Sequence, residues 1–128
     1  MITKEIIRIA SDTRNIGLTN KYNFKSSLKN KICGDKIKLE LTVKNLIIYS
    51  MKYETESCVY CEASASLLAK KIKNLNINSA IQVLSRVKEV ICGSKSILPV
   101  NFKDFKILIN KKNLSRIKCI NLPFDAVL

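Results

Sequence analysis

Residues 36–53 alternate between apolar and polar side chains, and this pattern constrains the fold of the 128-residue chain more than any other. A period of two is typical of a half-buried strand, and it runs over Lys36–Val43 before it resumes at Ile47. The polar pair Lys44-Asn45 supplies a turn between the two segments. The sequence therefore predicts an antiparallel hairpin with one apolar face and one wet face. The inward side chains of its second strand are predicted to be Ile47, Tyr49, Met51 and Tyr53.

Other segments carry apolar side chains at helical spacing. Predicted helices cover Thr3–Ile9, Glu62–Lys73, Asn78–Cys92 and the residues from Ser115 onward, with Ser115 as an N-cap. The inward residues of the two central helices are predicted to be Ala63, Leu67, Leu68 and Ile72, and Ile81, Leu84, Val87 and Ile91. Pro123 removes a backbone N–H, so we expect it to kink or end the last helix.

Two segments have no clear period. Ser11–Lys31 is polar and is expected to be a long loop, while Phe102–Ile109 fits either a short helix or an extended segment. The order of elements predicts an α+β domain, in which helices pack on one face of a small antiparallel sheet of about three strands. A length of 128 residues favours one domain spanning 1–128.

The net charge and the hydropathy of the chain bear on which classes of function it can have. The net charge is +13, but lysines are scattered along the whole chain and do not interleave with aromatic residues. We interpret them as a solvated basic surface and expect no nucleic-acid partner, although a basic nucleic-acid-binding domain stays open as an alternative. No apolar run is long enough to span a membrane, and the N-terminus does not resemble a signal peptide. The cytoplasm is the expected compartment.

Five cysteines and no histidine make thiols the main candidate metal ligands. Without an export signal they are expected to be reduced. Cys33 and Asp35 precede the first predicted strand and Cys58 follows the second, so a hairpin would bring these three together. With Cys119 they form a set of three thiols and one carboxylate, which can hold zinc or an iron–sulfur unit. Cys92, late in an apolar helix, fits a buried structural cysteine.

Four motifs carry a resemblance to the NifU/IscU/SufU family of iron–sulfur cluster assembly proteins. They are Cys33-Gly34-Asp35 before an alternating strand, Cys58 leading into Ala63-Ser64-Ala65-Ser66, Arg116-Ile117-Lys118-Cys119-Ile120-Asn121-Leu122, and Arg14-Asn15-Ile16-Gly17. The resemblance implies a SufE/NifU-like fold. It also implies that Cys33, Asp35, Cys58 and Cys119 bind a transient [2Fe–2S] cluster or iron, with zinc as the alternative.

The resemblance further implies a scaffold or carrier rather than an enzyme. Such a protein receives sulfur from a cysteine desulfurase and passes a cluster to acceptor apo-proteins. The alternative is a SufU-like zinc-dependent sulfurtransferase, with Cys119 as the sulfur acceptor. Lys118 stands before Cys119 as in the SufU branch. It is a candidate to pair with Asp35 or to stabilise a thiolate, and the alternative is a lysine that faces solvent. Homo-oligomers in which subunits share a cluster stay open.

The chain departs from the family pattern at several positions. Ser57 precedes Cys58 where the family usually has glycine. Cys61 is an additional cysteine and completes a Cys-x-x-Cys sequence with Cys58. It can serve as a spare ligand, a persulfide acceptor or a packing residue. The segment Lys112–Arg116 replaces the chaperone-recognition sequence of the IscU branch, which argues against chaperone-dependent release of that type.

Overall fold

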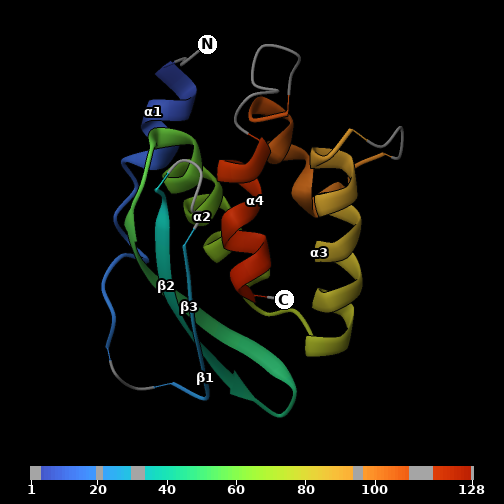
Figure 1. Cartoon of the computed structure of the whole chain (residues 1–128). Coiled ribbons are helices and arrows are strands. Elements are labelled where there is room, and N and C mark those ends of the chain that lie inside the picture. The colour runs from blue at the N-terminus through green and yellow to red at the C-terminus, as the bar shows by residue number, and fades with distance from the viewer. Residues whose placement is uncertain (1–3, 20–21, 30–33, 94–96, 110–116, 128) are drawn as a thin grey trace.

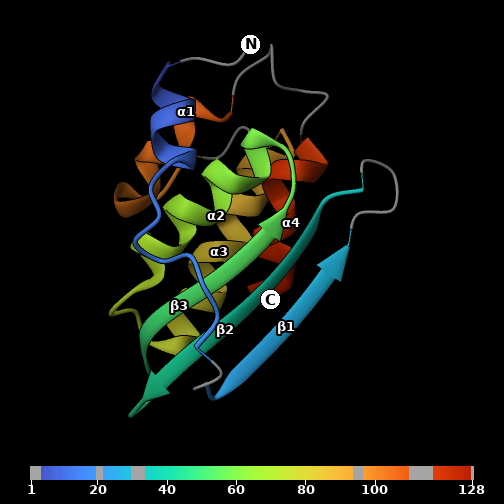
Figure 2. The same ribbon diagram turned by 90° about the vertical axis from the view of Figure 1, so that its left-hand side faces the viewer.

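The structure is a computed structural model that describes residues 4–19, 22–29, 34–93, 97–109 and 117–127. Its elements in chain order are α1 (Lys4–Ala10), β1 (Phe24–Lys29), β2 (Lys36–Lys44), β3 (Ile47–Glu56), α2 (Val59–Ile72), α3 (Ile77–Ile91), the 3₁₀ helix η1 (Val100–Ile107) and α4 (Ile117–Val127) (Figure 1). The antiparallel strands lie in the order β1-β2-β3. Figure 2 shows α2, α3 and α4 on the same side of this sheet. The predicted α+β class is therefore confirmed.

Strand β1 corrects the expectation of a loop over Ser11–Lys31. Phe24 pairs with Leu41 of β2, and the pairing continues to the end of β1. Five of its six residues are exposed, so the strand lacks the alternation that marks a half-buried strand. Pairing with β2, the next strand along the chain, stabilises this segment. That contribution is invisible in the local pattern.

The β2–β3 hairpin forms as predicted, but the inward residues of β3 shift at its start. The register changes between Thr42 and Val43, so Val43 lies opposite Ile48 instead of Tyr49. A bulge of this kind moves the following side chains to the other face of the sheet. Ile48 is therefore buried, while Ile47 and Tyr49 are exposed. The prediction was wrong for these two residues and right for Met51 and Tyr53, which are buried.

The outer face of the hairpin is less wet than predicted. Glu40, which alternation places on this face, is only 2% exposed. The backbone N–H of Thr19 donates to a Glu40 carboxylate oxygen at 2.8 Å. The same N-terminal segment runs along the edge of β3, where Gly17 N donates to Tyr53 O at 2.9 Å. This segment covers part of a face that the sequence alone presents as solvated.

Helix α2 packs on β3 and lies beside α4, which itself contacts β1 and β2 (Figure 1). All four of its predicted inward residues are buried, namely Ala63, Leu67, Leu68 and Ile72. The small side chains of Ser64 and Ala65 permit close packing, and the hydroxyl of Ser64 donates to the carbonyl of Ile120 in α4 at 2.6 Å. Phe105 of η1 packs edge-on against Phe124 of α4 and completes the core on this side.

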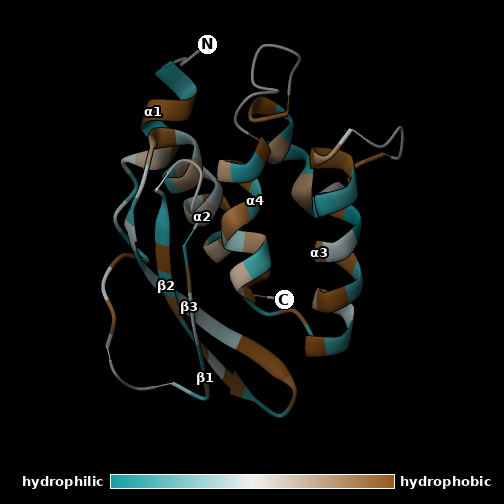
Figure 3. Ribbon diagram, in the orientation of Figure 1, coloured by the Kyte–Doolittle hydropathy of each residue, from teal (hydrophilic) through white to brown (hydrophobic). Residues whose placement is uncertain are grey.

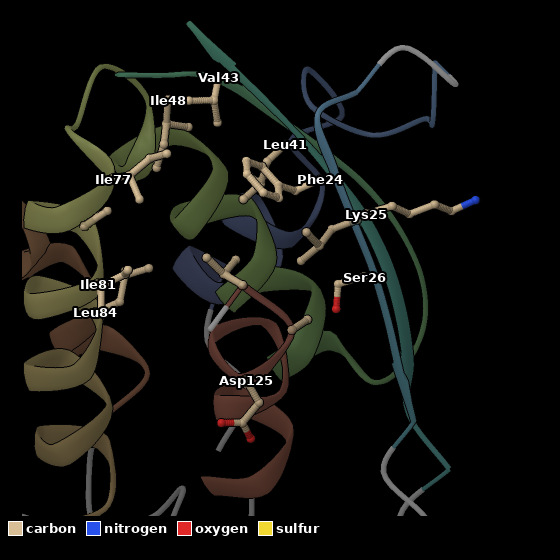
Figure 4. A pocket seen from close by; sticks show the side chains of 14 residues that line it. Phe24, Lys25, Ser26, Leu41, Val43, Ile48, Ile77, Ile81, Leu84 and Asp125 are labelled. Carbon is tan, nitrogen blue, oxygen red and sulfur yellow. The ribbon is translucent and has the colours of Figure 1, made fainter. Parts of the chain in front are cut away.

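Helix α3 follows its apolar pattern with one exception. Leu84, Val87 and Ile91 are buried as predicted, but Ile81 is 51% exposed and the prediction for it was wrong. Figure 3 shows hydrophobic and hydrophilic residues succeeding one another along this helix. Ile81 lines a cavity of about 450 Å³ between α3, the sheet and the end of α4, into which it points together with Leu84 (Figure 4). Helix α3 packs mainly on α4 rather than on the strands, which leaves Ile81 half-exposed.

Helix α4 runs through Pro123 to Val127, so of the two predicted effects, a kink or an end, Pro123 does not end the helix. The residues on either side of it, Leu122 and Phe124, are buried. Their burial offsets the cost of the hydrogen bond that proline removes. Ser115, the predicted N-cap, lies outside the described residues. The segment Phe102–Ile109, which the sequence left open, is mostly a 3₁₀ helix. None of the described helices is long and apolar enough to cross a membrane.

Two substitutions on α3 test this packing. Leu84→Ala should lower the free energy of unfolding by about 2–5 kcal/mol, because Leu84 is fully buried. Ile81→Ala, one turn away, should lower the free energy of unfolding by less than about 1 kcal/mol, because half of Ile81 is exposed to solvent. Urea unfolding followed by circular dichroism measures both values. Equal losses of unfolding free energy in the two variants would contradict the orientation of α3.

Candidate metal centre

Three side chains from separate segments converge at one end of the hairpin. They are Asp35 just before β2, Cys58 between β3 and α2, and Cys119 in the first turn of α4. One carboxylate oxygen and the two sulfur atoms all lie within 4.8 Å of one another. Asp35 and Cys119 are buried, and Cys58 is half-buried. The set therefore has a closed side and an open side.

The hairpin positions Asp35 and Cys58 as the sequence predicted. The first residue of β2, Lys36, pairs with the last residue of β3, Glu56, so the chain enters and leaves the hairpin at the same place. Cys58 N donates to one Asp35 oxygen at 3.1 Å, and the Cys58 thiol lies 3.5 Å from the other. Gly34 has a φ of +77°, which a residue with a side chain rarely adopts, so this turn into Asp35 favours glycine.

Cys58 is also the N-cap of α2. The helix begins at Val59, three residues before the predicted start at Glu62, and Glu62 N donates to the carbonyl of Cys58 at 3.2 Å. The helix dipole and the free N–H groups of the first turn favour negative charge at this position. The Cys58 side chain makes no capping hydrogen bond to the helix. Its sulfur is directed toward Asp35 instead.

Cys119 reaches the site because α4 packs on α2. The Ser64–Ile120 hydrogen bond fixes the residue directly after Cys119 to the middle of α2. Ser64 belongs to the Ala/Ser-rich motif that carries the family resemblance, but its contact with α4 was not predicted. A small residue with a hydroxyl group can donate to the backbone of a closely packed helix. That property of Ser64 is the signal in the sequence that could have predicted this contact.

The donor set suits a cation with an affinity for thiolate. Two thiolates and a carboxylate carry three negative charges, and bringing them within 4.8 Å of one another is favourable only when protons or a metal ion offset that charge. Soft thiolates favour zinc or iron, and zinc binds both sulfur and carboxylate oxygen. The residues brought together therefore fit a zinc ion or an iron–sulfur cluster.

Three further residues that the sequence singles out have different outcomes. Cys33 lies outside the described residues, so its role as a ligand stays a prediction. Lys118 is exposed, and the ion pairs found among the described residues do not include a Lys118–Asp35 pair. Cys92 is exposed at the C-cap of α3, so the prediction that it is buried was wrong, and its sulfur accepts a hydrogen bond from Asn121 at 3.1 Å.

Comparison with known proteins identifies the family. Residues 1–109 match the NifU-like N terminal domain. The chain belongs to this family. The matched region includes Cys33, Asp35 and Cys58 and ends before Cys119, so the contribution of Cys119 rests on the geometry of α4.

Curated relatives of this family member differ in the role that their names give. The chain is 29% identical over 115 residues to the zinc-dependent sulfurtransferase SufU of Bacillus subtilis, covering 89% of this chain and 78% of the relative. It is 27% identical over 100 residues to the iron–sulfur cluster assembly scaffold protein IscU of Thermotoga maritima, covering 77% and 70%. The two relatives are almost equally similar to this chain.

Solved structures of NifU-like proteins share the fold. A putative scaffold protein of the SUF system from Fervidobacterium islandicum superimposes with a TM-score of 0.86 at 19% identity, over 98% of this chain and 93% of that one. A NifU-like N-terminal domain from Brucella abortus gives a TM-score of 0.83 at 20% identity, over 98% and 88%. At such low identity these likenesses support the fold only.

Asp35→Ala should weaken zinc binding by at least about tenfold, because it removes an oxygen ligand and the acceptor that positions Cys58. Competition with a chromophoric chelator measures the affinity. Asp104→Ala is the matched control, since Asp104 is an exposed carboxylate paired with Lys71 outside the metal centre. Equal affinities for wild type and Asp35→Ala would exclude Asp35 as a ligand.

Proposed function

We propose that this protein is a scaffold or carrier for iron–sulfur cluster assembly. It holds a transient [2Fe–2S] cluster or iron through Cys33, Asp35, Cys58 and Cys119 and transfers it to acceptor apo-proteins. A cysteine desulfurase supplies the sulfur. The observation that carries the proposal is the convergence of Asp35, Cys58 and Cys119, one carboxylate and two thiols drawn from separate segments of the chain. Similarity to the IscU scaffold of T. maritima supports it.

The ligand types explain how such a site can both keep and release its cargo. Thiolates bind iron and zinc firmly because they are soft ligands. The harder carboxylate of Asp35 is the ligand that an incoming thiol of an acceptor protein displaces most readily. Cys58 is half-buried, so an acceptor can approach from that side, while Asp35 and Cys119 keep the other side closed to water. In this proposal the cluster is cargo that the site holds only transiently.

A zinc-dependent sulfurtransferase is the second candidate function, supported by the similarity to SufU of B. subtilis and by Lys118. In this scheme zinc occupies the same ligands, and Cys119 accepts persulfide sulfur from a cysteine desulfurase. Cys119 is only 3% exposed, so sulfur would have to reach it through the more open Cys58. The two functions share one site and differ in what it holds between turnovers.

The remaining properties follow from these functions. We propose that residues 1–128 act as one domain in the cytoplasm, with the desulfurase and the acceptors as protein partners. The net charge of +13 suits acidic patches on those partners. No membrane or nucleic-acid partner is needed for either function. A homo-oligomer in which two copies share a cluster is compatible with the open side at Cys58.

Anaerobic purification without chelator, followed by quantification of zinc, iron and acid-labile sulfide, tests the function. Iron and sulfide in about equal amounts, with visible absorbance, would support the scaffold. About one zinc per chain without sulfide would support the zinc-dependent form.

Substitutions locate the metal or cluster. Cys58→Ala and Cys119→Ala should each lose most of the bound metal or cluster. Cys92→Ala should keep the wild-type amount, because Cys92 lies outside the ligand group. Wild-type protein that binds neither metal nor cluster after reconstitution would contradict both functions.

A further inference from the structure

Cys61 is a second thiol one helical turn from a metal ligand, and neither proposed function uses it. Cys58 is the N-cap of α2 and Val59 is its first residue, so Cys61 is the third residue of the helix. Cys61 is fully buried and is not part of the Asp35–Cys58–Cys119 group. The structure therefore holds a Cys-x-x-Cys pair directly at a helix start, immediately after a strand, with one half-open and one closed thiol.

We propose that Cys61 is a resolving thiol, which displaces sulfur from a persulfide on Cys58 and releases it as hydrosulfide into the metal centre. The proposal rests on the proposed function, because that function supplies the persulfide. It adds an activity to the site, the conversion of persulfide sulfur to sulfide by the chain's own dithiol. An iron–sulfur cluster contains sulfide, so such a step supplies sulfur in the form that the cluster needs.

The N-cap position makes this reaction geometrically accessible. An N-cap side chain ordinarily turns back over the first turn of its helix and reaches the N–H of the third residue, which in α2 is Cys61. At present the Cys58 sulfur points to Asp35, at 3.5 Å, and makes no such contact. Rotation about the Cα–Cβ bond of Cys58 would turn its sulfur away from Asp35 and toward the first turn of α2, which contains Cys61. The extended backbone of Cys58, with φ −73° and ψ 166°, is unaffected by that rotation.

The solvent exposure of each thiol determines which cysteine first receives the persulfide sulfur. Cys58 is half-buried, whereas Cys61 and Cys119 are 0% and 3% exposed, so among these thiols a sulfur donor meets Cys58 first. If the persulfide forms on Cys119 instead, its terminal sulfur is still in reach of Cys58, whose sulfur lies within 4.8 Å of that of Cys119. Either route delivers the persulfide next to Cys61.

The step is a thiol–disulfide exchange. The Cys61 sulfur forms a bond to the Cys58 sulfur, and the bond between that sulfur and the terminal sulfur breaks. The terminal sulfur leaves with the bonding electron pair as hydrosulfide, and the proton lost by Cys61 is balanced by the proton that converts hydrosulfide to hydrogen sulfide. The product is a Cys58–Cys61 disulfide. A dithiol reductant from outside the chain returns both residues to thiols by a second exchange.

The disulfide and the metal site exclude each other. Cys58 cannot ligate a metal ion while its sulfur is bonded to Cys61, so sulfide release and metal binding alternate at one residue. A bound metal ion in turn holds the Cys58 sulfur on the Asp35 side and should protect it from Cys61. The pair therefore couples sulfur reduction to the loading state of the site.

A single-turnover experiment tests the inference with glutathione persulfide as the probe. Reduced, metal-free wild-type protein is mixed with the probe without any other reductant, and sulfide and intact mass are followed. Wild type should release about one sulfide per chain and lose about 2 Da, with fragmentation placing the disulfide between Cys58 and Cys61. Cys61→Ala should keep a persulfide, about 32 Da heavier, and release at least about tenfold less sulfide. Cys92→Ala should behave as wild type.

The outcomes separate this inference from the proposed function. A wild-type chain that retains its persulfide, or a Cys61→Ala chain that releases sulfide at the wild-type rate, would overturn the inference alone. If neither chain accepts sulfur, sulfur acceptance itself fails and both proposals fall. Cys61→Ser and circular dichroism of each variant show whether a loss reflects the missing thiol or a disturbed core. A disulfide between any other pair of cysteines would also overturn the assignment.

Discussion

The hydrogen bonds between Cys58 and Asp35 join the two ends of the β2–β3 hairpin, and the metal centre depends on them. The register of the hairpin brings both residues to one place, and the start of α2 fixes Cys58 as an N-cap. Helix α4 then adds Cys119 from the opposite side through its packing on α2. A shift of one residue in the hairpin register would turn neighbouring side chains to the other face of the sheet. The site is therefore a consequence of strand pairing and helix packing together.

The arrangement gives the three thiols around α2 different environments at short range. Cys58 is open to the surface, Cys119 is buried against α2, and Cys61 is enclosed in the core. Asp35 is the hydrogen-bond partner of Cys58. In the proposed function the same carboxylate is an oxygen ligand, so one side chain would both position Cys58 and bind the metal. A scaffold that must load and unload requires such a stable arrangement of exchangeable ligands.

Sequence reasoning predicted the hairpin, the helices and the approach of Asp35 to Cys58, because alternation and helical spacing are local signals. It failed where pairing or packing with another segment decides the outcome. Strand β1 has no local period, Glu40 is buried by a segment some twenty residues earlier in the chain, and the bulge at Tyr49 changes which side chains at the start of β3 face inward. The position of Cys119 relative to Cys58 could be inferred from the family resemblance but not from any local pattern, because helix–helix packing determines it.

X-ray absorption at the zinc edge of the zinc-loaded protein shows which atoms ligate the metal. If Cys33, Asp35, Cys58 and Cys119 are the ligands, we expect about three sulfur ligands at about 2.3 Å and one oxygen ligand at about 2.0 Å. The sulfur number should fall to about two in both Cys33→Ser and Cys58→Ser, and it should stay at about three in Cys92→Ser. Two results would contradict this ligand set. One is a wild-type site with one sulfur ligand or none, and the other is a sulfur number that does not fall in Cys58→Ser.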